Sequence, residues 1–162
     1  MQHRTLLRSR ATRALLALSV ALFAVACSKP AEPEDAIRAV INAIETAAED
    51  GDIGGIMEHL AEDYSDSDSN DKASLRGILF AQLQRSGGVS VTKRIDSITI
   101  SEAGDTAQSV VFAGLSDGPI TAGSTRADIW RFDLQFRADG RDWLVTRVDQ
   151  SQASLVQLAG GD

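Results

Sequence analysis

The sequence has almost no cysteine, since Cys27 is the only one among 162 residues. A single thiol cannot close a disulfide within the chain, so the fold must be held together by core packing. His59 is the only histidine after residue 26, so a cysteine–histidine metal site or a conventional nucleophilic triad cannot be assembled there. We therefore expect no metal, no cofactor and no assembled set of catalytic residues.

The sequence also lacks an excess of basic residues. Its 16 Lys and Arg stand against 23 Asp and Glu, and four of the arginines lie within residues 1–26, where no acidic residue occurs. Residues 27–162 therefore hold 12 basic and 23 acidic side chains, with a formal net charge of −11. Nucleic-acid binding needs a basic surface, so we expect no nucleic-acid partner.

No apolar run in the sequence is long enough to cross a membrane comfortably. The longest covers residues 14–26, about 13 residues interrupted only by Ser19, whereas a transmembrane helix needs roughly 20. It follows a basic segment and ends in small residues directly before Cys27, which is the order of a secretory signal peptide. We therefore interpret residues 1–26 as a signal peptide.

The end of this segment resembles the lipobox of bacterial lipoproteins. Residues 23–27 read Phe-Ala-Val-Ala-Cys, with Ala24 at the position where Leu is usual. The resemblance implies that Cys27 becomes the first mature residue and carries acyl chains, which anchor stably when two or more are present. Ser28 follows the cysteine in place of the Asp that retains lipoproteins at the inner membrane. We therefore expect a lipid-anchored cell-envelope protein on the periplasmic face of the outer membrane, with a tether over residues 27–33.

After the tether, apolar residues recur at helical spacing. The pattern predicts a first helix from Pro33 that stops at Gly51, and a short second helix capped by Asp52. A third predicted helix begins at residues 70–71 and ends at the glycine pair 87–88.

From residue 89 the apolar period changes from 3.6 to 2. A phase change near Asp96–Ser97 indicates a bulge, and Asp139–Gly140 is a hairpin turn signal. The predicted strands cover residues 89–100, 106–115, 125–137 and 142–149.

Helices followed by antiparallel strands indicate an α+β domain over residues 34–150, in which three N-terminal helices pack against a curved four-stranded antiparallel sheet. We expect residues 151–162 to form a C-terminal tail.

Two parts of the domain resemble the nuclear transport factor 2-like superfamily, which includes ketosteroid isomerases and polyketide cyclases. They are the passage 47–64 after the first helix, and the closing hairpin of segments 130–136 and 142–148. The resemblance covers residues 34–149 and implies a cone-shaped α+β fold with a cavity at its mouth. Relatives often pair as dimers, and an outer sheet face with Ile129 or Leu144 among polar residues would suit a homodimer.

The candidate ligand-pocket residues are Tyr64, Trp130, Phe132 and Trp143. Aromatic side chains on strand faces more often belong to a core, so a core role and a pocket role both stay open. A partly open cone would leave room at its mouth for a small apolar ligand.

The polar stretch 63–71 predicts a loop. Within it, Asp66, Asp68 and Asn70 have the alternate spacing with which calcium loops begin. Asp71 stands where such a loop needs glycine, and Gly77 where it needs glutamate, so a turn followed by a helix cap is favoured over a calcium site.

Two weaker patterns bear on catalysis. His59 has the residue type of a general base, but it lies beside the apolar face of a short predicted helix, which favours an exposed or capping role. Tyr64 with Asp63 or Asp66 imitates the tyrosine-plus-acid pair of ketosteroid isomerases. No position matches the catalytic aspartates of that family.

These observations predict a lipid-anchored envelope protein whose cone-shaped domain is a non-catalytic module. It would bind a small apolar ligand or another envelope protein, and it would contact the membrane through its lipid anchor. The alternative is an isomerase, cyclase or hydratase acting on a small apolar substrate in the cone. That alternative requires Asp, Tyr or His59 side chains to converge in a cavity.

Overall fold

The computed structural model describes residues 32–86, 89–116 and 128–161. The predicted signal peptide, Cys27, most of the predicted tether and the first residues of the predicted strand 125–137 lie outside these residues. Within the described residues, no helix is both long and apolar enough to span a bilayer.

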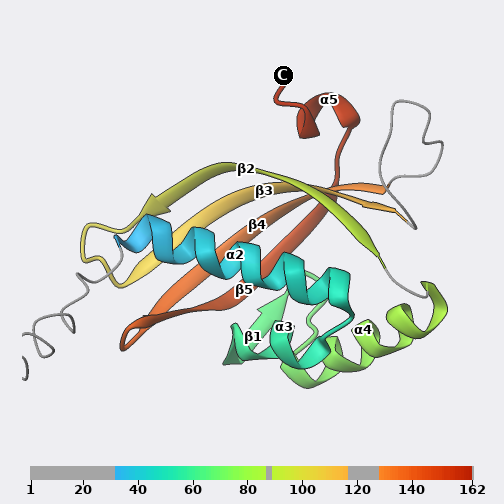
Figure 1. Cartoon of the computed structure of the whole chain (residues 1–162). Helices are drawn as coiled ribbons and strands as arrows, with labels where there is room; N and C mark the ends of the chain where they lie inside the picture. Colours follow the sequence, from blue (N-terminus) through green and yellow to red (C-terminus); the bar gives the residue numbers. More distant parts are fainter. Residues whose placement is uncertain (1–31, 87–88, 117–127, 162) are drawn as a thin grey trace, which may run out of the picture. The chain divides into compact units, whose positions relative to one another are not determined.

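Three helices open the described domain, as the sequence predicts (Figure 1). They are α2 (Pro33–Asp50), α3 (Ile53–Glu58) and α4 (Lys72–Ser86). Gly51 ends α2 in the left-handed region, with a φ of 68°, which glycine adopts without steric cost. The Asp52 carboxylate caps α3 by accepting a hydrogen bond of 3.0 Å from the Gly55 amide.

The sheet has five strands, in the order β1-β5-β4-β3-β2. Strand β1 pairs parallel with β5, and the other neighbours are antiparallel. The prediction of a four-stranded antiparallel sheet is therefore wrong. The sheet has a fifth strand, β1, and this strand runs parallel to its neighbour β5. The missed strand carries Asp63 and Ser65 within a polar, non-alternating segment, so its pairing with β5 is not visible in the local sequence. The strands are β1 (Leu60–Asp66), β2 (Ser90–Ile100), β3 (Thr106–Ser116), β4 (Asp128–Asp139) and β5 (Asp142–Gln152).

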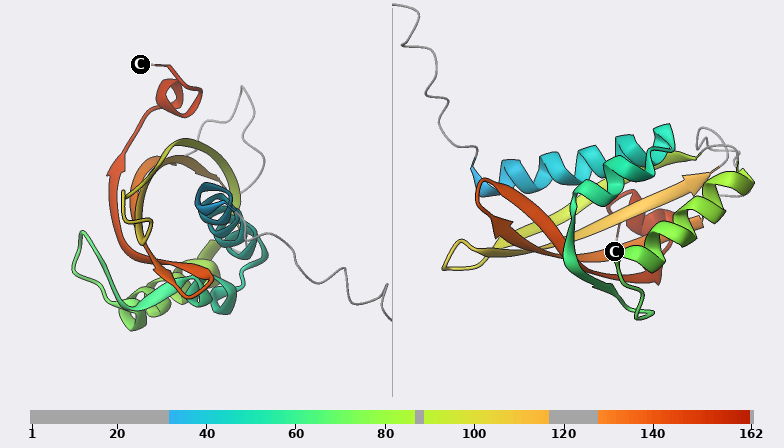
Figure 2. Two further views of the ribbon diagram at one scale, coloured as in Figure 1. Left: turned by 90° about the vertical axis from the view of Figure 1, so that its left-hand side faces the viewer. Right: turned by 90° about the horizontal axis from the view of Figure 1, so that it is seen from below.

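Two irregularities curl the sheet around α2, and Figure 2 shows the strands wrapping the helix. The pairing of β2 with β3 shifts between Ile95 and Ser97, which confirms the predicted bulge. The pairing of β4 with β5 shifts where Thr146 is the extra residue. Bulges bend a strand and increase its twist. The buried Ser109 hydroxyl donates to the Ser97 carbonyl oxygen at 2.8 Å, which satisfies a polar group beside the first bulge.

The best-packed part of the core lies where the first half of α2 meets the hairpin ends of β3, β4 and β5. Ile37 and Val145 are fully buried, and Phe136 is 1% exposed. Trp143 is buried in the same cluster. Side chains from α2, β4 and β5 therefore fill this narrow end of the cone.

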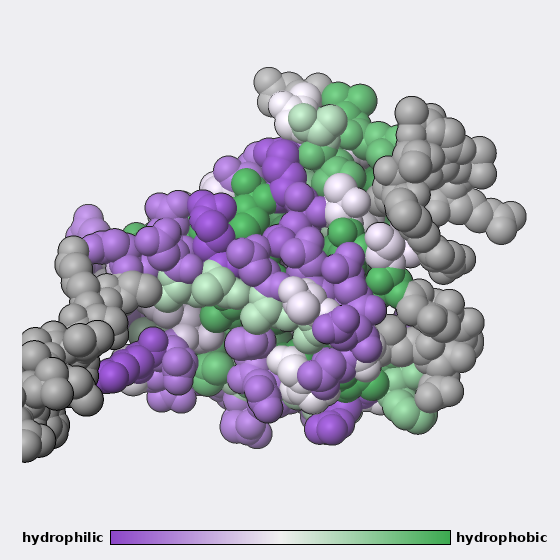
Figure 3. Space-filling model, in the orientation of Figure 1, coloured by the Kyte–Doolittle hydropathy of each residue, from purple (hydrophilic) through white to green (hydrophobic). Residues whose placement is uncertain are grey.

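The tail is partly ordered against the outer face of the sheet. Helix α5 (Leu155–Leu158) is capped by Ser154, and the Arg94 guanidinium donates to the carbonyl oxygens of Leu158 and Gln157 at 3.1 and 2.7 Å. Figure 3 shows hydrophobic residues gathered over α5.

The outer-face residues considered for a homodimer differ in exposure. Ile129 is buried within the domain, and Leu144 is half-buried. Leu144 alone of the two is therefore partly accessible to another copy, and the homodimer stays a prediction.

Replacing Phe136 with Ala should lower the free energy of unfolding by about 3–5 kcal/mol, because it empties a filled core site. Urea unfolding followed by circular dichroism measures this change. Thr99→Ala on the exposed outer face is the control, and it should change the same quantity by less than about 0.5 kcal/mol. If Phe136→Ala lowered the free energy of unfolding by less than about 1 kcal/mol, Phe136 would not fill the core as described.

Candidate functional site: the cavity inside the cone

A cavity of about 440 Å³ lies inside the wide end of the cone. Its volume falls in the range of small-molecule sites, about 300–1,000 Å³. Most of the wall is apolar and comes from α2, α4 and the inner face of the sheet. Representative wall residues are Ile41, Ile44, Leu79, Val111, Phe132 and Leu134.

Helix α4 closes one side of the cavity. Leu75 and Leu79 lie half-buried in the wall. Ile78 also lines the cavity but is 49% exposed, and the neighbouring Phe80 is 57% exposed. The mouth of the cavity therefore has an apolar rim that water reaches.

Two charged side chains in the wall neutralise each other. Glu45 on α2 and Lys93 on β2 form an ion pair, and their side chains are only 22% and 15% exposed. Each charge compensates the other in a largely dry setting, which makes separating them costly. The sequence gives no signal for this pair, because 48 positions separate the two residues.

A second polar group lies at the end of β1. The Asp66 carboxylate accepts hydrogen bonds from the Asp68 amide (2.9 Å), the Asn70 amide (2.8 Å) and the Asn70 side-chain nitrogen (3.0 Å). Burial acts to raise the pKa of Asp66, but these hydrogen bonds outweigh it and the pKa is lowered. Asp66 is therefore ionised at neutral pH.

The segment after Asp66 forms a turn that leads into a helix cap. The Asp71 carboxylate accepts a hydrogen bond of 2.7 Å from the Ser74 amide at the start of α4. Gln150 on β5 donates to the Asp68 carboxylate at 3.4 Å. Among the described residues, no group of three or more His, Cys, Asp or Glu side chains is arranged to hold a metal ion.

Tyr64 on β1 is 4% exposed and lines the cavity. Burial, with a further contribution from the negative charge of Asp66, raises the pKa of Tyr64 to about 12. Among the described residues, no hydrogen bond contributes to the pKa of Tyr64, and no fully buried side-chain oxygen lacks a partner, so the Tyr64 hydroxyl is reached by solvent through the cavity. The site therefore offers a neutral phenol that can donate to or accept from a bound molecule.

The other acid–base candidates lie outside the cavity wall. The Asp63 carboxylate receives two hydrogen bonds of 2.9 Å from the Arg137 guanidinium, which lowers the pKa of Asp63. His59 is half-buried after α3, and its carbonyl oxygen accepts from the Val145 amide at 2.9 Å. Tyr64 and Asp66 thus share the cavity, whereas Asp63 and His59 do not.

The four aromatic candidates separate into two groups. Tyr64 and Phe132 line the cavity. Trp143 is buried in the core cluster, and Trp130 is half-buried and is not among the wall residues. Whether any of them touches a ligand stays a prediction.

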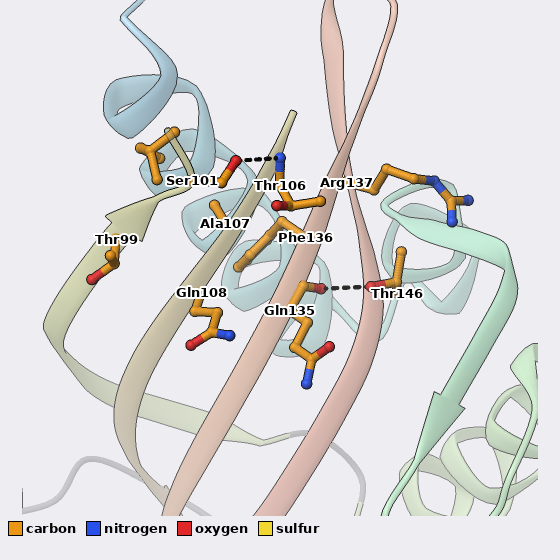
Figure 4. Close-up of a pocket in the computed structure, with 10 residues that line it drawn as sticks. Thr99, Ser101, Thr106, Ala107, Gln108, Gln135, Phe136, Arg137 and Thr146 are labelled. Atoms are coloured by element: carbon orange, nitrogen blue, oxygen red, sulfur yellow. Dashed lines mark hydrogen bonds between the residues drawn. The ribbon is translucent and has the colours of Figure 1, made fainter. Parts of the chain in front are cut away.

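A second hollow, of about 470 Å³, lies on the outer face of the sheet (Figure 4). It is bordered by exposed polar residues such as Thr99, Gln108 and Gln135, and the Thr146 hydroxyl donates to the Gln135 carbonyl oxygen at 3.3 Å. Exposed amides and hydroxyls of this kind are well solvated by water. The inner cavity, with its apolar wall, is therefore the better candidate for a binding site.

Solved structures with similar folds include a ketosteroid isomerase-like protein from Erwinia carotovora atroseptica. The alignment has a TM-score of 0.59 and 17% identity, and it covers 76% of this chain and 98% of that chain. An NTF2-like protein of unknown function from Pseudomonas putida aligns with a TM-score of 0.57 and 21% identity, over 75% and 88% of the two chains.

A protein from Novosphingobium aromaticivorans, named provisionally as a scytalone dehydratase, aligns with a TM-score of 0.59 and 13% identity. The alignment covers 75% of this chain and 84% of that chain. The sequence matches no protein-family profile and no curated protein. The similarity to these solved structures shows that the domain has the nuclear transport factor 2-like fold.

Because Tyr64 is the only tyrosine, its titration can be read directly from phenolate absorbance. We expect a midpoint of about 12 in the folded protein and about 10 after denaturation. Above pH 10 the unfolded chain loses this proton while the folded chain keeps it, so the contribution of Tyr64 to stability is lost as the pH rises. Tryptophan fluorescence shows at which pH the protein is still folded. A midpoint near 10 in the folded protein would contradict the burial of Tyr64.

Proposed function

We propose that this protein is a lipid-anchored envelope protein whose cone binds a small, mainly apolar molecule without transforming it. The observation that supports binding is the cavity, which has an apolar wall and an accessible mouth. Burial of apolar surface contributes about 25 cal/mol per Å², so such a cavity favours an apolar occupant over water. Tyr64 would add a hydrogen bond that orients it.

The polar groups of the cavity favour binding over acid–base catalysis. A general base or acid works best when its pKa lies near the operating pH. The pKa of Asp66 is lowered and that of Tyr64 is raised to about 12, so both move away from neutrality. Glu45 is already paired with Lys93.

Filling the cavity should weaken binding without unfolding the protein. Ala113 is buried and lines the cavity, so Ala113→Phe should weaken binding of a fluorescent naphthalene probe by at least about tenfold. Fluorescence titration measures the change. Val110→Phe, on the outer face of the same strand, is the control and should leave the affinity unchanged. Equal affinities in the two variants would place the probe elsewhere.

The proposed anchor depends on residues 1–27, whose basic, apolar and small segments precede Cys27. If Cys27 carries acyl chains, Cys27→Ser should move the protein from the membrane fraction to the soluble fraction, and globomycin should block processing of the natural chain. Immunoblots of fractionated cells test both, and sucrose-gradient separation tests the outer membrane. Ser28→Ala is the control, which should stay with membranes. Membrane retention of Cys27→Ser would exclude the lipid anchor.

A catalytic alternative has one observation in its favour, because Tyr64 and Asp66 line the same cavity. Two proteins of similar fold are named as a ketosteroid isomerase-like protein and, provisionally, as a scytalone dehydratase. Turnover of a ketosteroid that is lost in both Tyr64→Phe and Asp66→Asn would favour the enzyme. Binding without turnover would favour the proposed module.

A further inference from the structure

We propose that the cavity selects a hydrophobic cation, such as an ammonium group attached to an apolar body. This inference rests on the proposed binding function and adds the charge of the ligand. Its basis is the balance of charged groups around the cavity, together with the aromatic residues in the wall.

The cavity wall contains more negative than positive charge. Its charged residues are Glu45, Asp66, Asp68 and Lys93. Glu45 and Lys93 neutralise each other in their ion pair. The hydrogen bonds of Asp66 and Asp68 come from neutral groups, namely backbone amides, Asn70 and Gln150. The positive charge of Arg147 offsets part of the charge of Asp66. Asp68 adds a further negative charge to the wall, and none of the ion pairs of the described residues includes it.

Two nearby cations make their hydrogen bonds with other groups, and of the two acids Arg147 interacts electrostatically with Asp66. The Arg147 guanidinium donates to the Asp149 carboxylate at 3.0 and 2.6 Å. The Lys72 ammonium donates to the Leu60 carbonyl oxygen at 2.8 Å and to the Glu62 carboxylate at 2.7 Å. A bound cation would therefore supply charge compensation that these side chains do not give to Asp68.

The aromatic wall residues favour the same ligand class. Tyr64 and Phe132 line the cavity together, and the face of an aromatic ring attracts a desolvated cation. Tyr64 is only 4% exposed, no hydrogen bond contributes to its pKa, and its hydroxyl oxygen can accept a hydrogen bond from an ammonium group in the cavity.

An anionic ligand fits the site poorly. It would lie beside the like charges of Asp66 and Asp68, and it would share the positive charge of Lys93 with Glu45. Like charges within a few ångströms are repulsive, and the repulsion is strongest where water is excluded. A bare metal ion would leave the apolar wall without a partner.

The test uses three probes with one apolar body: naphthylmethylammonium, naphthylmethanol and naphthoate. We expect isothermal titration calorimetry on the whole protein to give an affinity for the ammonium probe at least about tenfold above that for the alcohol, with naphthoate the weakest. Asp68→Asn should remove most of this preference. Asp142→Asn makes the same charge change in an exposed hairpin and should preserve it.

The outcomes separate the charge inference from the binding proposal. If the alcohol binds as tightly as the ammonium probe, or if Asp68→Asn keeps the preference, the charge inference is wrong while the cavity remains a binding site. If none of the three probes binds and the Ala113→Phe test is also negative, both proposals fail. Asp68 is exposed and near the mouth, so its substitution should leave the fold intact, which tryptophan fluorescence can verify.

Discussion

The sheet of this domain curls around one helix, and α2 alone cannot fill the space that the curl encloses. Bulges at Asp96 and Thr146 bend β2 and β5. An α-helix with its side chains is only about 10–12 Å wide, so it packs fully where the strands converge and leaves space where they diverge. The filled core around Phe136 and the cavity beside Ile44 are therefore two consequences of the same geometry.

Most polar groups of the cavity wall find their hydrogen-bond or ion-pair partners within the protein. A buried polar atom without a partner is costly, and among the described residues no fully buried side-chain nitrogen or oxygen lacks one. Glu45 uses Lys93, and Asp66 uses the turn that follows it. Tyr64 differs because no hydrogen bond contributes to its pKa, and its hydroxyl lies in the cavity wall, where it can recognise a ligand. For these reasons we propose a binding site rather than a catalytic one.

Local sequence patterns predicted much of the fold but little of the site. The spacing of apolar residues, Gly51, Asp52 and the phase change at Asp96 indicated helices, caps and a bulge that the structure contains. Strand β1 was missed, because its polar sequence becomes a strand only by pairing with β5. Tyr64 and Phe132 were predicted as pocket residues and do line the cavity, whereas Trp143 packs in the core because it lies beside the hairpin turn.

The remaining features of the site depend on contacts between distant parts of the chain. Glu45 meets Lys93, and Asp68 meets Gln150, only after the sheet has curled. No local pattern encodes these contacts. The fold is likewise shared with proteins of different names, so it does not determine the ligand.

Methyl NMR spectroscopy tests the central claim most directly, because it reports where a ligand lies in the folded protein. Adding the naphthylmethylammonium probe should shift the methyl resonances of Ile44, Leu79 and Val111, which line the cavity. The methyl groups of Val110 and Leu144, on the outer face, should stay unchanged. Shifts confined to the outer-face methyl groups, or saturating shifts at neither set, would contradict a binding cavity inside the cone.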